Sequence, residues 1–259
     1  MTDEKCTVLE HVDVGSGYRR LKVSSPAIVK EVQAGQFVHV RVPQLDESSL
    51  RRPFSVFDAS DGVLTLLYKE VGRGTKALGL VAAGDVISIL GPLGHGFPSE
   101  VKGTALLVGG GYGVAPLYLL AKTLLRNSSE KVKLFVGGRT AADILALDEF
   151  RALGIEVFAA TNDGSLGEKG FVTAPLDKEL ADLSASSTPF EVFACGPDPM
   201  LKAVSERAVS SGAKGWISMD RHMICGVGAC YACIQKTVRG NSRCCVEGPV
   251  FAAEDLVWE

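Results

Sequence analysis

Five of the seven cysteines in this chain lie between positions 225 and 245, in sequence that is otherwise small and turn-prone. Cys225, Cys230 and Cys233 follow the spacing C-x4-C-x2-C, which is the spacing of the thiolates that hold a plant-type 2Fe-2S cluster. Gly226 and Gly228 would let backbone amides turn towards a cluster sulfide. Zinc is the alternative, but a four-cysteine zinc site usually takes its ligands as two close pairs. The spacing therefore favours iron and sulfide over zinc.

The same segment offers two candidates for a fourth ligand. The stretch SRCCVEGPVF at 242–251 places Cys244 next to Cys245, and spacing alone does not choose between them. Residues 219–259 also contain too little apolar sequence for an ordinary hydrophobic core. We therefore expect a small carboxyl-terminal domain at 219–259 that a bound cluster helps to hold together.

The composition limits the compartment and the partners. No apolar run approaches the roughly 20 residues that span a bilayer, and the amino-terminal MTDEKCTVLE does not look like a secretory signal. Clustered cysteines in such a chain indicate metal or redox chemistry in a reducing compartment, so we expect a cytoplasmic protein. The net charge is -3 and the basic residues are scattered, which argues against nucleic acid and membranes as partners.

The hydrophobic pattern changes near residue 98. Before it, short runs such as FVHVRVP and VLTLLYKE alternate apolar and polar residues, which predicts an antiparallel sheet or small barrel with one short helix at 75–81. After it, apolar strands alternate with helical runs, which predicts a parallel sheet covered on both faces, with WISMD at 216–220 as a candidate last strand. We expect an antiparallel β-barrel domain at 1–98, a parallel α/β domain at 99–218 and the cysteine domain at 219–259.

Two motifs in the first domain suit a flavin. RRPFSV at 51–56 offers arginines for a diphosphate and a serine hydroxyl for a flavin ring. Arginines beside a barrel strand are more often simply solvated. YKEVGRGTKAL at 68–78 strengthens the pattern, because Gly72, Gly74 and Thr75 open a helix whose free amides are candidates for the same diphosphate.

Two motifs in the second domain suit a dinucleotide. GGGYGVAPL at 109–117 lies between a strand and a helix, where dinucleotide-binding folds approach a pyrophosphate, although a tight turn is the alternative. CGPDPM at 195–200 follows a later strand of the same sheet, again at a carboxyl end. Cys195 is a candidate neighbour of a nicotinamide or, equally, a buried thiol.

In this order, RPFS, a GxGT loop, GGGxGVAPL and CGPDPM resemble the ferredoxin-NADP reductase superfamily. The resemblance implies an FAD-binding barrel and an NAD-binding sheet. Many members have tyrosine where this chain has Phe54, so a hydrogen bond from that phenol is absent here. The residues implied for FAD are Arg52, Pro53, Phe54, Ser55, Leu67, Tyr68, Lys69, Gly74 and Thr75. The residues implied for NAD are Gly110, Gly111, Gly113, Cys195, Gly196 and Pro197.

With CGVGACYAC and CVEGPVF added, the whole chain resembles the electron-transfer subunits of type B dihydroorotate dehydrogenase. The resemblance selects Cys245 over Cys244. The implied cluster ligands are Cys225, Cys230, Cys233 and Cys245. It also implies an FMN-containing catalytic partner, an assembly of two catalytic and two electron-transfer subunits, and electron flow from FMN through the cluster and FAD to NAD in de novo pyrimidine (UMP) biosynthesis.

Other functions stay open at the level of the residues. A stand-alone NAD(P)H-dependent flavin and iron–sulfur reductase for another acceptor would carry the same motifs, and a non-redox protein would bind zinc through the same cysteines. The residues do not choose between NAD and NADP, although TNDGSLG at 161–167 is expected to border the ribose pocket. No candidate base for deprotonating dihydroorotate is present, which agrees with a separate catalytic subunit.

Overall fold

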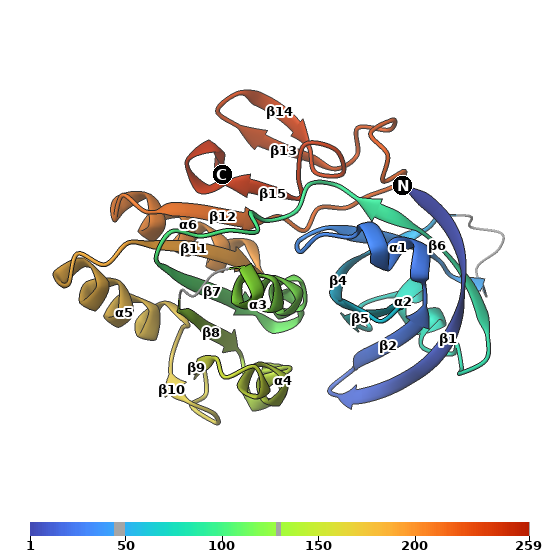
Figure 1. The fold of residues 1–259 in the computed structure, drawn as a ribbon, viewed down its shortest axis with the longest axis horizontal. Coiled ribbons are helices and arrows are strands. Elements are labelled where there is room, and N and C mark those ends of the chain that lie inside the picture. The colour runs from blue at the N-terminus through green and yellow to red at the C-terminus, as the bar shows by residue number, and fades with distance from the viewer. Residues whose placement is uncertain (44–49, 128–130, 259) are drawn as a thin grey trace.

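The computed structural model describes residues 1–43, 50–127 and 131–258. The amino-terminal part is a closed barrel in the strand order β1-β2-β5-β4-β3-β6 (Figure 1). Its elements are β1 (Thr2–Gly15), β2 (Tyr18–Ser24), α1 (Pro26–Glu31), β3 (Phe37–Arg41), β4 (Arg52–Ser60), β5 (Val63–Lys69), α2 (Arg73–Leu78) and β6 (Val86–Leu93). Val38, Leu64 and Leu66 are fully buried at alternate positions of their strands, so the predicted antiparallel barrel is confirmed.

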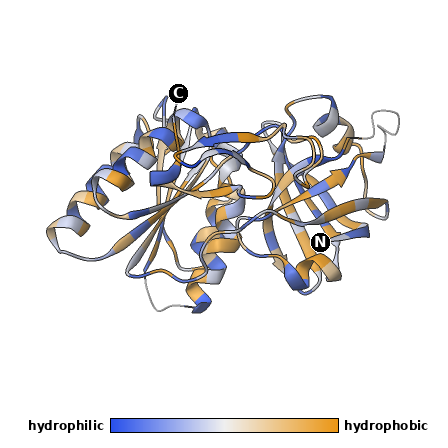
Figure 2. Ribbon diagram, turned by 90° about the horizontal axis from the view of Figure 1, so that it is seen from above, coloured by the Kyte–Doolittle hydropathy of each residue, from blue (hydrophilic) through white to orange (hydrophobic). Residues whose placement is uncertain are grey.

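The second part is a sheet in the order β10-β9-β8-β7-β11-β12-β15. Its strands are β7 (Thr104–Gly110), β8 (Val132–Gly138), β9 (Glu156–Thr161), β10 (Glu168–Lys169), β11 (Phe190–Cys195), β12 (Lys214–Ser218) and β15 (Val250–Ala252). Its helices are α3 (Ala115–Asn127), α4 (Leu147–Ala152), α5 (Thr173–Ala185) and α6 (Asp198–Ser210). Every residue of β7 is buried, as expected for a parallel strand covered on both faces, and Figure 2 shows apolar residues concentrated along the strands.

The helix α5 was not anticipated from the sequence. Its buried residues include Leu176, Leu180 and Leu183, which recur at the spacing of one helix face. The pattern was therefore present, but polar residues between these leucines weaken it. The helices α3 and α6 are among the helical runs expected between the strands.

The carboxyl-terminal segment corrects one expectation about the sheet. The strand at 216–220 was expected to be the last, but β12 is followed by β15, which pairs with it in antiparallel orientation, Ile217 opposite Phe251. The chain therefore returns to cover an edge that would otherwise expose unpaired amides and carbonyls. The rest of the segment forms the hairpin of β13 (Ile234–Thr237) and β14 (Gly240–Arg243).

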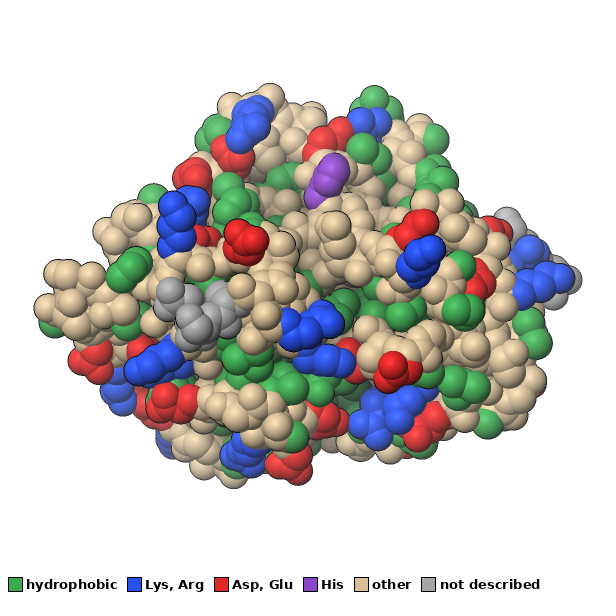
Figure 3. Space-filling view, viewed as in Figure 1, with side chains coloured by type: hydrophobic (Ala, Val, Ile, Leu, Met, Phe, Trp, Pro, Cys, Tyr) green, Lys and Arg blue, Asp and Glu red, His purple; other side chains and the backbone are tan. Residues whose placement is uncertain are grey.

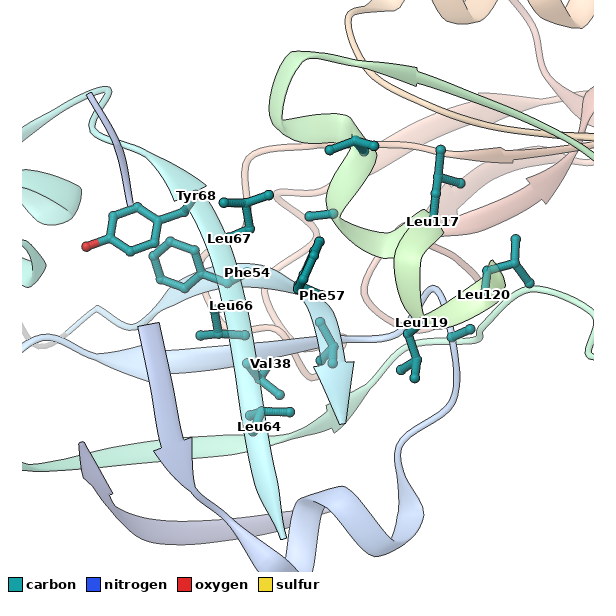
Figure 4. Close-up of a cluster of buried hydrophobic side chains, with 14 of the residues drawn as sticks. Val38, Phe54, Phe57, Leu64, Leu66, Leu67, Tyr68, Leu117, Leu119 and Leu120 are labelled. Atoms are coloured by element: carbon teal, nitrogen blue, oxygen red, sulfur yellow. The ribbon is translucent and has the colours of Figure 1, made fainter. Parts of the chain in front are cut away.

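The helices α3 and α4 pack against the barrel and connect it to the sheet. Phe57 of β4 stacks on Tyr118 of α3 with ring centroids 4.5 Å apart, beside the leucines of α3 that Figure 4 shows. Lys122 of α3 forms an ion pair with Asp58 at 2.6 Å. The cysteine segment lies over the seam between the two parts (Figure 1), where the His95 amide donates to the Gly248 carbonyl at 2.6 Å.

The described chain contains no helix that is both long and apolar enough to cross a membrane. On the face shown in Figure 3, acidic and basic side chains are interspersed.

Candidate cofactor site and metal centre

Arg51 and Arg52, the two arginines of the motif RRPFSV, have different hydrogen-bond partners. Arg51 donates to the Asp3 carboxylate at 2.8 Å and to the Ser88 carbonyl at 3.2 Å, so it ties barrel strands together. Arg52 donates to neighbouring backbone carbonyls and has no carboxylate partner in the described part of the chain. A Cβ at Gly74 would lie 2.5 Å from Arg52 Nε, so the glycine makes room for this guanidinium. Arg52 is therefore the arginine that remains available to a diphosphate.

Residues of β4 and β5 point alternately into and out of the barrel. Phe54 and Tyr68 point inwards, with ring centroids 5.2 Å apart (Figure 4). Tyr68 Oη lies 3.0 Å from His11 Nε2, and burial raises the pKa of Tyr68. Ser55 and Leu67 alternate with the aromatic pair and lie on the outer face. The Ser55 hydroxyl has no protein partner among described residues, so the outer face is the one that can meet a flavin.

Lys69, which the resemblance assigns to FAD, is engaged by protein groups. Its Nζ donates to Tyr18 Oη at 3.0 Å and lies 3.4 Å from Asp143 Oδ1. Tyr18 Oη donates to Asp143 at 2.9 Å. Burial acts to raise the pKa of Asp143. The hydrogen bonds from Tyr18 and the Thr140 amide, together with the charge of Lys69, outweigh burial and hold this pKa below its usual value. This trio bridges the barrel and the sheet.

The loop before α2 is closed by a threonine. Thr75 Oγ1 accepts from the amides of Val71 and Gly72, at 2.8 and 3.1 Å. These two amides are therefore not free for a diphosphate. The loop has fewer free amides than the sequence motif predicted. The Thr75 hydroxyl also donates to the Gly72 carbonyl at 3.1 Å, so it shapes the loop beside Arg52. Its place in an FAD site stays a prediction.

The two glycine-rich motifs of the sheet meet at the carboxyl ends of β7 and β11. These strands are neighbours, with Gly109 opposite Cys195. A Cβ at Gly113 would lie 2.4 Å from the Cys195 carbonyl oxygen, and one at Gly110 would lie 2.7 Å from Pro197 Cδ. Gly110 and Gly113 therefore let the two loops pack on each other.

Gly111 and Gly196 occupy different sides of this junction. A Cβ at Gly196 would lie 2.6 Å from Met200 Cε, so Gly196 also serves loop packing. Gly111, with a φ of 54°, begins the 3-10 helix Gly111–Val114. The Cβ direction of Gly111 points at Tyr18 Oη of the barrel, 3.6 Å away. Gly111 is thus the glycine of the motif that faces the barrel.

Cys195 is a buried thiol near two exposed polar side chains, Tyr112 and Asp220. Burial, followed by the charge of Asp220, raises the pKa of Cys195 to about 12, so it is a neutral thiol at pH 7. Tyr112 Oη donates to Asp220 Oδ2 at 3.3 Å, and burial raises the pKa of Asp220. The sequence pattern pointed to Cys195 alone, because Tyr112 and Asp220 come together only in the folded sheet.

The loop at 161–167 lies beside the carboxyl end of β8. The Asn162 amide donates to the Gly138 carbonyl at 3.1 Å, and Ser165 Oγ accepts from the Ala141 amide at 2.7 Å. Asp163 accepts from the Ser165 hydroxyl at 2.6 Å, which fixes the loop. Its role at a ribose pocket stays a prediction.

The four expected cluster ligands influence one another. Cys230 lowers the pKa of Cys225 against burial, whereas burial, Cys233 and Cys225 raise the pKa of Cys245. No group of three or more His, Cys, Asp or Glu side chains in residues 1–43, 50–127 and 131–258 stands in metal-binding geometry. A cluster of two irons needs four thiolates, two for each iron.

The cysteine loop also directs amides at sulfur. The Val227 and Ala229 amides lie 3.5 and 3.3 Å from Cys225 Sγ. Burial acts to raise the pKa of Cys225. The Val227 amide, Cys230 and the Ala229 amide outweigh burial and lower this pKa to about 6. Amides aimed at a thiolate stabilise the negative charge of cluster sulfur. The four neighbouring thiols and these amides fit a 2Fe-2S cluster.

Cys244 differs from its neighbour. It is completely buried, and burial followed by Cys233 raises the pKa of Cys244 to about 12. The amide of Cys244 donates to the Cys233 carbonyl at 2.8 Å, so this residue holds two parts of the segment together through its backbone. The side-chain link of Cys245 to Cys233 supports Cys245 as the fourth ligand, which stays a prediction.

The structure also brings His39 to this site, a residue that no sequence motif marked. His39 lies opposite Pro53 of the RPFS motif, on the face of β3 turned away from the barrel interior. It is 0% exposed. A Cβ at Gly226 would lie 2.6 Å from the ring of His39, so this histidine separates the flavin motif from the cysteine loop.

Three family models match the chain in succession. Residues 5–97 match the oxidoreductase FAD-binding domain, residues 107–206 the oxidoreductase NAD-binding domain, and residues 220–257 the iron-sulfur cluster binding domain of dihydroorotate dehydrogenase B. The chain therefore carries FAD-binding, NAD-binding and iron–sulfur domains in this order.

Similar proteins span nearly the whole chain. The dihydroorotate dehydrogenase B (NAD(+)) electron transfer subunit of Fusobacterium nucleatum is 37% identical over 99% of both chains. The subunit of that name from Geobacillus thermodenitrificans is 38% identical over 98% of both. Among solved structures, NADH-dependent reduced ferredoxin-NADP oxidoreductase superposes with a TM-score of 0.86 at 32% identity, covering 98% of this chain and 90% of that one.

Proposed function

The chain belongs to the family of dihydroorotate dehydrogenase B electron transfer subunits, and from this premise we propose that it carries electrons from a catalytic partner through a 2Fe-2S cluster and FAD to NAD. The donor would be dihydroorotate, oxidised to orotate on the partner in pyrimidine biosynthesis. The observation that carries the proposal is that the flavin motif, the dinucleotide loops and the cysteine loop all border one seam between the barrel and the sheet.

The described residues at this seam would have different roles in binding the cofactors. A flavin, when bound, exchanges two electrons with a nicotinamide and single electrons with an iron–sulfur centre. Arg52 would hold the diphosphate of FAD, and the free hydroxyl of Ser55 would meet the flavin ring. The bridge of Lys69 with Tyr18 and Asp143 would fix the spacing of the barrel and the sheet. Gly111 would let the dinucleotide approach the backbone.

The partner would dock beside the cysteine loop. Ile224, Val227 and Tyr231 are 47, 45 and 64% exposed, and Cys230 between them is exposed as well. Exposed apolar side chains grouped around a redox centre favour a protein partner, because docking there buries them and shortens the electron path. We assign this patch to an FMN-containing catalytic subunit, in an assembly of two catalytic and two electron-transfer subunits.

The thiols also bear on the compartment. All seven cysteines are free, including the buried Cys6, Cys195 and Cys244. A reducing compartment maintains this state, so we place the assembly in the cytoplasm.

Anaerobic reconstitution tests the proposal. The chain, loaded with FAD and iron–sulfur cluster, is mixed with the FMN-containing catalytic subunit, and NADH formation is followed on addition of dihydroorotate. We expect NADH formation that requires both proteins. If both cofactors are loaded and the mixture stays inactive while the chain alone reduces dyes with NADH, the function is that of a stand-alone reductase. A colourless protein with zinc and no iron would overturn both functions.

A further inference from the structure

His39 is a buried polar side chain whose ring nitrogens are unused. Neither Nδ1 nor Nε2 has a hydrogen-bond partner in the described residues, although the side chain is fully buried. Such a group costs stability compared with an apolar residue of similar size. Its neighbours along β3, Val38 and Val40, are apolar and equally buried. A ring nitrogen at this position therefore needs a partner from outside the described residues.

The imidazole lies directly against the cysteine loop. Gly226 has a φ of 70°, and a Cβ there would lie 2.6 Å from His39 Cε1, 2.8 Å from Nε2 and 2.9 Å from Nδ1. The three distances are nearly equal, so the chain immediately after Cys225 lies over the face of the imidazole, next to both ring nitrogens. Phe37 packs beside the imidazole with ring centroids 5.6 Å apart, which limits its rotation.

We propose that His39 is a positioning residue of the cluster, donating a hydrogen bond from one ring N–H to a sulfur atom of the 2Fe-2S centre beside Cys225. The inference rests on the proposed function, because it requires the cluster. Burial, followed by the charge of Arg51, lowers the pKa of His39 to about 4, so at pH 7 the ring is neutral and carries one N–H. Cluster sulfur accepts such bonds, and they favour the more negative reduced state.

The test measures the reduction potential of the cluster in the FAD-loaded protein. His39→Leu removes the donor at similar size, and His39→Gln keeps an N–H donor. We expect His39→Leu to lower the ratio of reduced to oxidised cluster at a fixed potential about ten-fold, which is 59 mV for one electron. His39→Gln should recover most of this loss. His95→Gln is the matched control, since His95 is exposed at the same seam, and should change nothing.

A second measurement needs no variant at His39. With 15N-histidine labelling, pulsed electron paramagnetic resonance of the reduced wild-type cluster should show coupling to a histidine nitrogen. His222 is exposed and close in sequence to Cys225, so the coupling should survive His222→Gln. Loss of the coupling in that variant, or its absence from the wild type, would overturn the inference. So would a loaded His39→Leu protein with wild-type potential. An absence of any cluster signal would instead refute the proposed function.

Discussion

Every residue of β7 is buried, whereas in the hairpin of β13 and β14 only Gln235 and Thr237 are. The sheet and the barrel are held by apolar side chains, each contributing about 1.5–3 kcal/mol when fully buried. The carboxyl-terminal segment buries three thiols, Cys233, Cys244 and Cys245, besides apolar residues such as Phe251 and Leu256. The difference teaches that hydrophobic burial dominates in two parts of this chain, and that the third also depends on what its cysteines bind and on the surface it covers.

The largest effect should come from a ligand. Cys233→Ser should remove the cluster, reducing iron and acid-labile sulfide from about two atoms each per chain to almost none, because one iron loses a thiolate. Hydrogen exchange should then accelerate in residues 220–258 and stay slow in β7. Cys244→Ser, at an equally buried thiol, should keep the iron. Full iron content in Cys233→Ser would contradict the assignment.

A substitution in the apolar core should destabilise the sheet independently of the cluster. Phe135 is fully buried and stacks on Phe158 with centroids 4.9 Å apart. Phe135→Ala should lower the free energy of unfolding of the sheet by about 3–5 kcal/mol in urea titrations. The loss should be the same with and without iron. Phe171→Ala, at a side chain that is 71% exposed, should change stability by less than about 0.5 kcal/mol. An iron-dependent loss for Phe135→Ala would break the comparison.

Acid should destabilise the contact between His39 of the barrel and the cysteine loop. The pKa of His39 is lowered to about 4 by burial and then by Arg51, against about 6.5 in the unfolded chain. The neutral ring therefore stabilises the folded state fully above pH 6.5. This stability, on the order of 3 kcal/mol, should be lost as the pH falls from 6.5 towards 4. Comparing urea midpoints of wild type and His39→Leu isolates it; parallel pH profiles would contradict the prediction.

The loop against His39 can be tested by adding one methyl group. Gly226→Ala combines a positive φ of 70° with a collision against His39, whereas Gly240→Ala combines a φ of 105° with open space. Both should lose stability through backbone strain. Gly226→Ala should lose about 1–3 kcal/mol more, because the ring must shift. Thermal unfolding with the cluster bound measures the difference, and equal losses would show that the loop moves away freely.

The smallest effect should come from an ion pair between barrel and sheet. Asp58→Asn removes the contact with Lys122, whose Nζ lies 2.6 Å from the carboxylate in a partly buried setting. We expect a loss of about 0.5–1 kcal/mol, and a coupling of similar size in a double-mutant cycle with Lys122→Met. Asp148→Asn, in a pair that lies largely in solvent, should show almost none. A coupling above about 2 kcal/mol would mean that the junction depends on charge as well as on packing.

Some of the expected site could not have been read from the sequence. Lys69 looked like a flavin contact, but Tyr18 and Asp143 occupy its ammonium group. The amides at the start of α2 looked free, but Thr75 uses two of them. Both outcomes depend on side chains that arrive from distant positions or turn back locally. The individual FAD, NAD and cluster residues, and the boundaries at 98 and 218, stay predictions.

The sequence by itself determined the two kinds of sheet, the order of the three domains and the spacing of Cys225, Cys230 and Cys233, because periodicity and spacing are local properties of a chain. Only the tertiary structure decided that β15 completes the sheet, that Cys245 lies near Cys233 and Cys225, and that His39 lies beneath Gly226. Those contacts join residues far apart in the chain, and they form only when the segments pack over one seam.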